Sequence, residues 1–183
     1  MSKYLVASDL HGDVYYISKL LKAFEKEEAS RLILLGDILY HGPRNTIPEN
    51  YNPKAVIPLL NAIKEKIYCV KGNCDAEVDE MALEFPFVKE SMFTFPSFVV
   101  FATHGHIINE AHMPPLSKGD ILLHGHTHIP TWHTNENGVR IFNPGSVSIP
   151  KNNSKHSYMT IDETSALWKD VETMVEYHRE SLK

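Results

Sequence analysis

Seven residues of this chain are of types that bind metal ions, and they occur in short pieces that mostly contain glycine. They are Asp9, His11, Asp37, Asn73, His104, His126 and His128. Two carboxylates, one amide and four imidazoles suit a pair of divalent cations that share one carboxylate. Such a pair is suited to the hydrolysis of phosphate esters, because it can activate water and neutralise charge on the phosphoryl oxygens.

The spacing of these residues indicates how they could meet. Side chains two residues apart on a strand point the same way, so Asp9 with His11, and His126 with His128, can each converge on one cation. Asp37 and Asn73 each follow a glycine at the end of an apolar run. In open α/β sheets, ligands gather beyond the carboxyl ends of the strands. We therefore expect one crevice to collect all of these residues.

The types of ligand also limit the metal. Oxygen and imidazole donors without a thiolate ligand favour Mn, Fe or Zn over metals that prefer soft ligands. A closed structural zinc site is disfavoured, because such sites usually take four ligands rich in cysteine. We expect a two-metal crevice with open positions for water and substrate.

The elements that would position these residues alternate in the first half of the chain. Apolar runs at 3–7, 31–35 and 67–71 predict buried strands. Asp13 predicts the start of a helix through Ile17, Leu20, Leu21 and Phe24, and Asn52-Pro53 predicts another. Alternation of strand and helix predicts right-handed crossovers and a largely parallel sheet.

The second half changes character. Strands are expected at 91–95, 98–103, 120–123, 131–133, 139–143 and 158–161, with a hairpin turn at 135–138. They predict a second, mostly antiparallel sheet packed on the first, with helices on the outer faces. The tail is open to two interpretations, since 167–178 fits the spacing of a helix and 166–170 could equally complete a hairpin.

Bulk properties agree with an enzyme of the α/β class. The length of 183 residues and the 43% hydrophobic content fit a single domain, residues 1–183. A net charge of −5 argues against stable binding to nucleic acid. The apolar runs are too short to cross a membrane, no apolar signal region follows Met1, and Cys69 and Cys74 form no CxxC pair. We expect a soluble cytoplasmic protein.

The order of the motifs resembles a known family. Asp-x-His, Gly-Asp, Gly-Asn-x-Asp and Gly-His-x-His, spread over residues 4–161, resemble the calcineurin-like metallophosphoesterase superfamily. The short length and the stretch 36–44 are most similar to its small bacterial YfcE-type phosphodiesterases. The resemblance implies a two-sheet αββα sandwich and two divalent metals, most commonly Mn, with Zn or Fe as alternatives. It also implies a homo-oligomer.

The resemblance assigns the ligands to two metals. Asp9, His11, Asp37 and His128 would hold the first, while Asp37, Asn73, His104 and His126 would hold the second. A hydroxide that bridges the two metals would attack phosphorus in line.

One position departs from the family. Many relatives have histidine after the Gly-Asn, where it contacts phosphate, whereas this chain has Cys74. A thiol with a pKa near ~8.5 cannot supply the positive charge of an imidazolium, so we expect weaker help to poor leaving groups.

Three further residues are candidates for the active site. Asp75 could take part in catalysis or cap the following helix. His106 could contact the substrate or support the ligands. Arg44, in the loop 40–51, could bind phosphate or lie on the surface without a role.

The leading hypothesis is a metal-dependent phosphodiesterase that acts on a small phosphodiester. One alternative is a phosphomonoesterase or nucleotidase. The other is a non-catalytic scaffold similar to a retromer subunit of the same fold. The complete ligand set argues against a scaffold.

Overall fold

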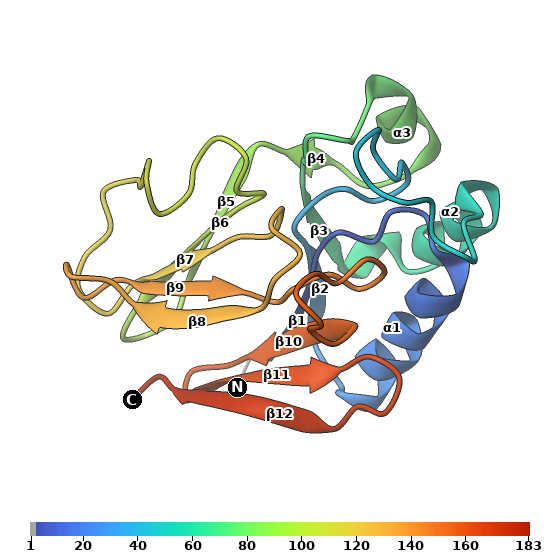
Figure 1. Cartoon of the computed structure of the whole chain (residues 1–183). Helices are drawn as coiled ribbons and strands as arrows, with labels where there is room; N and C mark the ends of the chain where they lie inside the picture. The colour runs from blue at the N-terminus through green and yellow to red at the C-terminus, as the bar shows by residue number, and fades with distance from the viewer. Residues whose placement is uncertain (1–2) are drawn as a thin grey trace.

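The computed structural model describes residues 3–183, which form two β-sheets packed face to face with helices on one side (Figure 1). The three predicted apolar runs of the first half are the parallel strands β1 (Tyr4–Ala7), β2 (Arg31–Leu34) and β3 (Ile67–Val70). The helices between them are α1 (Val14–Lys26) and α2 (Pro53–Asn61). A 3₁₀ turn (Lys64–Lys66) precedes β3. The predicted α/β fold of two sheets is confirmed.

Both predicted helix starts are confirmed. The Asp13 side chain accepts a hydrogen bond from the backbone N–H of Tyr16 at 3.1 Å and caps α1. The Asn52 side chain caps α2 in the same way, and Pro58 lies inside that helix. Leucine, isoleucine and phenylalanine recur on one side of α1, so this side is buried against the sheet.

The first sheet has seven strands, in the order β12-β11-β10-β1-β2-β3-β4 (Figure 1). The short β4 (Phe87–Val88) extends the parallel part, and β10 (Ser157–Ile161) is antiparallel to β1. The expectation that 158–161 would join the second sheet is therefore wrong. An apolar strand does not encode which neighbour it pairs with, and β10 completes the first sheet at its open edge.

The tail forms a hairpin of β11 (Ser165–Asp170) and β12 (Glu176–Ser181), so the helical interpretation of 167–178 is wrong. The hairpin forms because the chain turns at Asp170. The Asp170 carboxylate accepts the backbone N–H groups of Glu172 and Thr173 at 3.0 and 2.9 Å. A side chain that bonds the backbone two and three residues onward favours a turn over a helix interior.

The second sheet has five strands, in the order β5-β6-β7-β9-β8, and it is mixed rather than mostly antiparallel. Strands β6, β7 and β9 are parallel to one another. The long connection 104–120 returns the chain from the end of β6 to the start of β7, and β8 returns it between β7 and β9. The strands are β5 (Glu90–Thr94), β6 (Val99–Thr103), β7 (Ile121–Leu123), β8 (Thr131–Thr134) and β9 (Arg140–Asn143).

Within residues 3–183 the helices, including the short α3 (Glu77–Ala82), cover the outer face of the first sheet alone (Figure 1). The outer face of the second sheet is covered by the connection 104–120, from which Ile108, Met113 and Leu116 pack on the sheet. The expected second helical layer is therefore replaced by a loop. No helix in residues 3–183 is long and apolar enough to cross a membrane.

Strand alternation divides the core in two. In β1, Leu5 and Ala7 face the helices, while Val6 faces the second sheet. Because each central strand is clamped on both faces, its carboxyl end and the loop that follows are held in a fixed position.

Candidate metal centre

Within each sheet, backbone hydrogen bonds join the loops that follow neighbouring strands. The N–H of Asp9 donates to the carbonyl of Gly36 at 3.1 Å, and the N–H of His11 donates to that of Asp37 at 2.9 Å. In the second sheet, the N–H of Gly125 donates to the carbonyl of His104 at 2.9 Å. The predicted crevice at the carboxyl ends of the strands is thus present.

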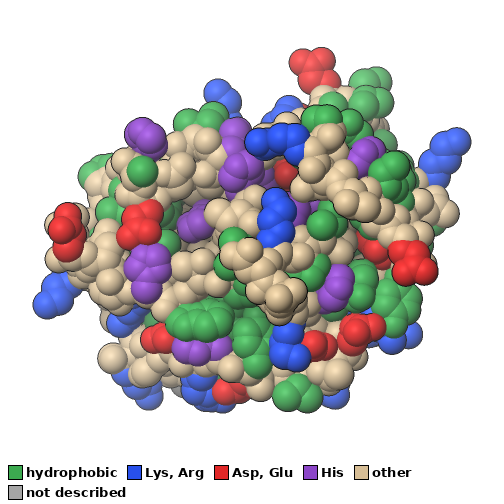
Figure 2. All heavy atoms as spheres, in the orientation of Figure 1, with side chains coloured by type: hydrophobic (Ala, Val, Ile, Leu, Met, Phe, Trp, Pro, Cys, Tyr) green, Lys and Arg blue, Asp and Glu red, His purple; other side chains and the backbone are tan. Residues whose placement is uncertain are grey.

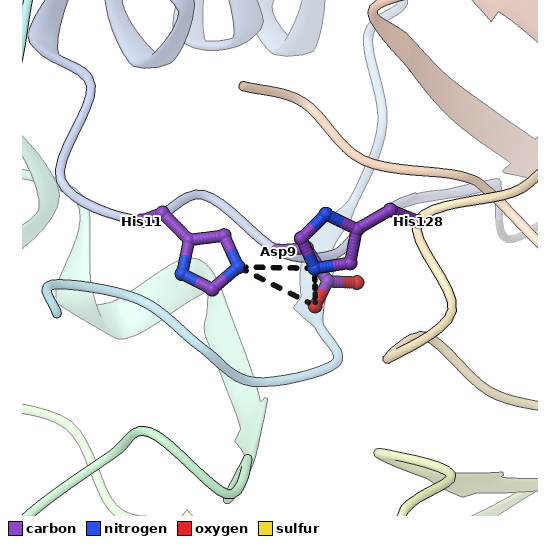
Figure 3. A group of neighbouring side chains, drawn as sticks. All are labelled: Asp9, His11 and His128. Carbon is purple, nitrogen blue, oxygen red and sulfur yellow. Dashed lines mark hydrogen bonds and ion pairs between the residues drawn. The ribbon is translucent and has the colours of Figure 1, made fainter. Parts of the chain in front are cut away.

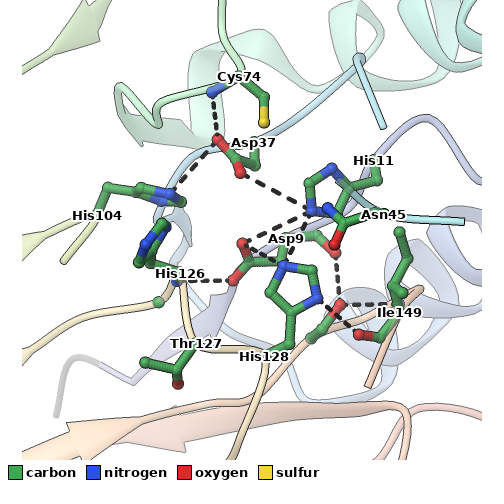
Figure 4. Close-up of polar contacts among 12 residues, drawn as sticks. Asp9, His11, Asp37, Asn45, Cys74, His104, His126, Thr127, His128 and Ile149 are labelled. Carbon is green, nitrogen blue, oxygen red and sulfur yellow. Dashed lines mark hydrogen bonds and ion pairs between the residues drawn. The ribbon is translucent and has the colours of Figure 1, made fainter. Parts of the chain in front are cut away.

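Five of the seven predicted ligands form a tight cluster. The ligand atoms of Asp9, His11 and His128 lie within 4.8 Å of one another, as do those of Asp9, Asp37 and His104 (Figures 3 and 4). One oxygen of Asp37 lies 3.8 Å from His11 Nε2, and the other lies 3.4 Å from His104 Nε2. Asp37 therefore lies between the two groups, as a shared ligand must.

The other two predicted ligands adjoin this cluster on its open side. Asn73 Oδ1 lies 3.0 Å from His104 Nε2, and the ring centre of His126 lies 5.1 Å from that of His104. Asn73 is exposed and His126 is half-buried, whereas the remaining five ligands are buried. All seven residues therefore border one crevice.

Backbone carbonyls orient three of the imidazoles. The Nδ1 atoms of His11, His104 and His128 lie 2.8, 2.6 and 2.6 Å from the carbonyls of Tyr40, Leu35 and Ile149. Because a carbonyl only accepts, each Nδ1 must carry the hydrogen and donate it. Each Nε2 then points into the crevice, which is how proteins commonly orient imidazole ligands toward a metal.

The centre of the cluster fits a cation. The Nε2 atoms of His11 and His128 are 3.2 Å apart, and burial lowers the pKa of His11, so a proton between them is disfavoured at neutral pH. Asp9 Oδ1 is fully buried and has no hydrogen-bond partner in residues 3–183, although it lies 3.3 Å from His128 Nε2. Two lone pairs and an unpaired carboxylate oxygen that face one another suit a divalent ion.

Five predicted ligands have an uncommon backbone conformation. The φ angles of Asp9, His11, Asp37, His126 and His128 are 55°, 45°, 57°, 66° and 62°. Residues other than glycine adopt this left-handed region at a cost of roughly 1–2 kcal/mol, and such residues concentrate at functional sites. The conformation turns each side chain back into the crevice.

Space explains two of the glycines beside the ligands. A Cβ at Gly72 would lie 2.1 Å from Asp37 Oδ1, and one at Gly125 would lie 1.8 Å from Ser8 Oγ. Neither position can hold a larger residue while the loops remain as close as they are.

Sequence analysis missed a set of supporting residues. The hydroxyls of Ser146 and Ser148 both donate to the backbone carbonyl of Asp9, at 2.8 and 3.1 Å. The Asn143 side chain donates to the carbonyl of Gly125 at 2.8 Å, which braces the loop that carries His126 and His128. The turn sequence 143–146, Asn-Pro-Gly-Ser, is the signal that could have drawn attention to this segment.

The pKa values of the clustered side chains depend on one another. Burial opposes ionisation of Asp37, but the hydrogen bond and charge of His104 hold the pKa of that carboxylate well below its usual range. His104 is buried, yet Asp37 and Asp9 raise its pKa to about 9. Burial and the charge on His104 lower the pKa of His126 to about 4.

A model of the calcineurin-like phosphoesterase superfamily domain matches residues 3–166 of this chain. The chain belongs to that superfamily. It is 42% identical to the phosphodiesterase YfcE of Escherichia coli K12 over 164 residues, which cover 88% of each protein. The solved structure of that phosphoesterase superposes with a TM-score of 0.95 at 36% identity, over 99% of this chain and 100% of that one.

Two more distant solved structures share the fold. The structure of an archaeal phosphodiesterase is 18% identical, with a TM-score of 0.63 over 98% of this chain and 99% of that one. A variant of Vps29 from Entamoeba histolytica is also 18% identical, with a TM-score of 0.56 over 98% of each chain.

Cys74 lies beside two of the predicted ligands of this superfamily member. Its sulfur forms a group with ligand atoms of His11 and Asp37 within 4.8 Å, and its backbone N–H donates to Asp37 Oδ1 at 2.8 Å (Figure 4). Burial and the carboxylate of Asp37 raise the pKa of the thiol to about 12. The thiol is therefore neutral at physiological pH.

Asp75 contacts backbone rather than the centre of the crevice. Its carboxylate accepts the N–H groups of Asp37, Ile38 and Gly72 at 2.8, 2.8 and 2.7 Å. Burial raises its pKa to about 6, against the effect of these three donors. The prediction that Asp75 caps the next helix is wrong, because its hydrogen bonds tie the ends of β2 and β3 together and the N-cap of α3 is Ala76.

Arg44 borders the crevice. The pocket beside these predicted ligands, here called the main pocket, has a volume of about 360 Å³ and is lined by Arg44 and Lys151 together with Asp37, Asn73, His126 and His128. Histidine and basic side chains gather near the centre of this face of the molecule (Figure 2). His106 is exposed and lies in a neighbouring pocket, and its ring centre is 5.3 Å from that of His104.

Proposed function

We propose that this protein is a metal-dependent phosphodiesterase. The observation that carries the proposal is the convergence of His11 Nε2, His128 Nε2 and the unpaired Asp9 Oδ1, with Asp37 between them and His104. The 42% identity to a phosphodiesterase supports the same activity.

The seven ligands divide into two proposed subsites. Asp9, His11 and His128 form the first subsite, Asn73, His104 and His126 form the second, and Asp37 is common to both. When bound, two divalent cations would supply a nucleophile from water and neutralise charge on the phosphoryl oxygens. Asn73 suits the open side, because an amide binds a cation without reducing its charge.

The remaining residues fit supporting roles. Arg44 and Lys151 line the main pocket, where their charge would attract a phosphate group. The neutral Cys74 thiol gives little help to a poor leaving group. His106 stands beside the second subsite, within reach of a substrate's second ester group. We assign Asp75 to positioning, because it fixes the strand ends that carry Asp37 and Asn73.

We propose manganese as the metal, because the oxygen and imidazole donors suit Mn, Fe or Zn and Mn is the ion that members of this family most commonly use. Elemental analysis of freshly purified protein, followed by reconstitution of chelated protein with Mn, Zn or Fe, tests this assignment. Faster turnover with Zn or Fe than with Mn would contradict it.

The activity is tested with two substrates that release the same product. Chelated protein is supplied with Mn and assayed with bis-p-nitrophenyl phosphate and with p-nitrophenyl phosphate. We expect hydrolysis of the diester that disappears with chelator. Preference for the monoester would support a phosphomonoesterase, and metal binding without hydrolysis of either would support a scaffold.

We also propose that the protein acts in the cytoplasm and self-associates. Both cysteines of residues 3–183 are free thiols, as in a reducing compartment. Val78 and Met81 on α3 are 65% and 85% exposed, and a second copy could cover them. Light scattering during size-exclusion chromatography tests self-association, and localisation of a tagged copy tests the compartment.

A further inference from the structure

A second pocket adjoins the proposed active site. This side pocket, of about 410 Å³, is lined by residues that include Lys71, Asn73, Lys89, Glu90, His106 and Ile107. Asn73 lines both pockets, and the ring centre of His106 lies 6.1 Å from that of His126. Both pockets therefore adjoin the second proposed subsite.

The two pockets differ in charge. Asp37, a proposed metal ligand, is the one carboxylate among the described residues that line the main pocket, beside the cations Arg44 and Lys151. The side pocket is lined by the cations Lys71 and Lys89 and by the carboxylates of Asp75 and Glu90, and Lys71 is paired with Glu80 outside the pocket. The main pocket suits an anion, and the side pocket has no comparable excess of positive charge.

An apolar wall distinguishes the side pocket. Ile107 is 69% exposed and lines it together with Ile108, which packs on the core of the second sheet. A single exposed isoleucine is ordinary on a protein surface. Here it borders a pocket that opens beside the proposed ligands, so it would be covered by whatever a bound phosphoryl group carries in that direction.

We infer that the side pocket binds the second ester substituent of the substrate, and that this substituent is uncharged and apolar, such as an aryl or branched alkyl group. The inference rests on the proposed function and names a substrate class for it. A phosphodiester carries two substituents on phosphorus, so one can occupy the side pocket while the phosphoryl oxygens face Arg44 and Lys151. A monoester leaves the side pocket empty.

The test compares two diesters with the same leaving group, methyl p-nitrophenyl phosphate and phenyl p-nitrophenyl phosphate, on the Mn-loaded protein. Burial of a ring-sized apolar group contributes about tenfold or more, so we expect kcat/KM to be at least about tenfold higher for the phenyl ester. In Ile107→Ser this ratio should fall by about threefold or more. Val175→Ser is the matched control, since Val175 is 62% exposed in the turn between β11 and β12.

Binding gives a readout that needs no turnover. Methanesulfonate and phenylmethanesulfonate are tetrahedral anions without a scissile ester, and calorimetry gives their dissociation constants. We expect the preference for the phenyl compound to weaken in Ile107→Ser and to persist in Val175→Ser.

The outcomes separate the two proposals. Failure of the protein to hydrolyse either diester would contradict the phosphodiesterase activity, while the sulfonates would still report on the side pocket. If Ile107→Ser leaves both phenyl preferences unchanged, the side pocket does not bind the substituent and the inference is overturned.

Discussion

The two proposed metal subsites differ in how the protein encloses them. In the first, Asp9, His11 and His128 are buried, and backbone carbonyls fix both imidazoles. In the second, Asn73 is exposed and His126 is half-buried beside the main pocket. We therefore expect the first subsite to enclose its cation and the second to leave its cation open to the substrate.

Proton affinity differs in the same direction. Burial lowers the pKa of His11, so its Nε2 is free at neutral pH, whereas Asp37 and Asp9 outweigh burial at His104 and raise its pKa to about 9. A cation must displace a proton to bind His104 but not to bind His11. The two subsites should therefore fill in order, and the predictions below test that difference.

Removal of the shared ligand, Asp37, should empty both subsites. In Asp37→Ala we expect loss of both metals and a fall in diester hydrolysis of about 10³-fold or more, because each subsite loses a carboxylate. Elemental analysis and a Mn-dependent assay measure both effects. Glu136→Ala, in an exposed turn of the β8–β9 hairpin, is the control. Substantial metal and activity in Asp37→Ala would contradict the shared role.

Metal affinity should depend on pH more steeply at the second subsite. Below about pH 9, the raised pKa of His104 means that one proton leaves as the cation binds. Apparent affinity should therefore rise about tenfold per pH unit between pH 6 and pH 8, and should change less at the first subsite. Equilibrium dialysis with Mn gives both slopes. Equal slopes for the two metals would argue against the assignment.

Loss of a hydrogen bond that positions Asp9 should have a moderate effect on the metal affinity of the first subsite. Ser146→Ala removes a hydroxyl that donates to the carbonyl of Asp9. We expect about tenfold weaker binding of the first metal, because loss of a group that orients a ligand typically weakens binding by roughly 10- to 100-fold. Ser154→Ala is the control, since the Ser154 hydroxyl donates to the carbonyl of Lys151 at the surface. An unchanged first affinity would show that Ser146 does not position Asp9.

A gain of activity rather than a loss is expected at Cys74, on the open side of the cluster. Cys74→His should raise turnover of diesters with poor leaving groups by about tenfold, because an imidazolium can donate the proton that the thiol retains. Esters of p-nitrophenol should gain less, and Cys74→Ser controls for loss of sulfur. Should Cys74→His be no faster on the poor leaving groups, Cys74 does not limit protonation.

Sequence patterns predicted where strands and helices form better than they predicted which strands pair with each other. The apolar runs at β1 and β2 predicted buried strands, because each strand faces two layers of core. The same patterns could not show that β10 pairs with β1, since partner choice depends on contacts far along the chain. The sequence around Asp170 does not distinguish a hairpin from a helix, because the spacing of apolar residues in the tail fits both structures.

In the candidate site, too, local patterns were predictable from the sequence and long-range contacts were not. Residue types and glycines predicted which side chains border one crevice, since metal chemistry restricts which side chains can serve as ligands. The role of Ser146 depends on a contact with Asp9 across 137 residues of chain, and no local pattern records such a contact. The backbone angles of the ligands were equally hidden, because aspartate and histidine also occupy ordinary conformations.

The left-handed backbone at Asp9, His11, Asp37, His126 and His128 restricts how the metal preference could be redesigned. A replacement ligand must both coordinate the new ion and tolerate a positive φ, which asparagine does readily and β-branched residues do not. Saturation mutagenesis should therefore show a narrower range of permitted residues at these five positions than donor chemistry alone would allow. Transplanting the centre into another scaffold would require copying the turns together with the side chains.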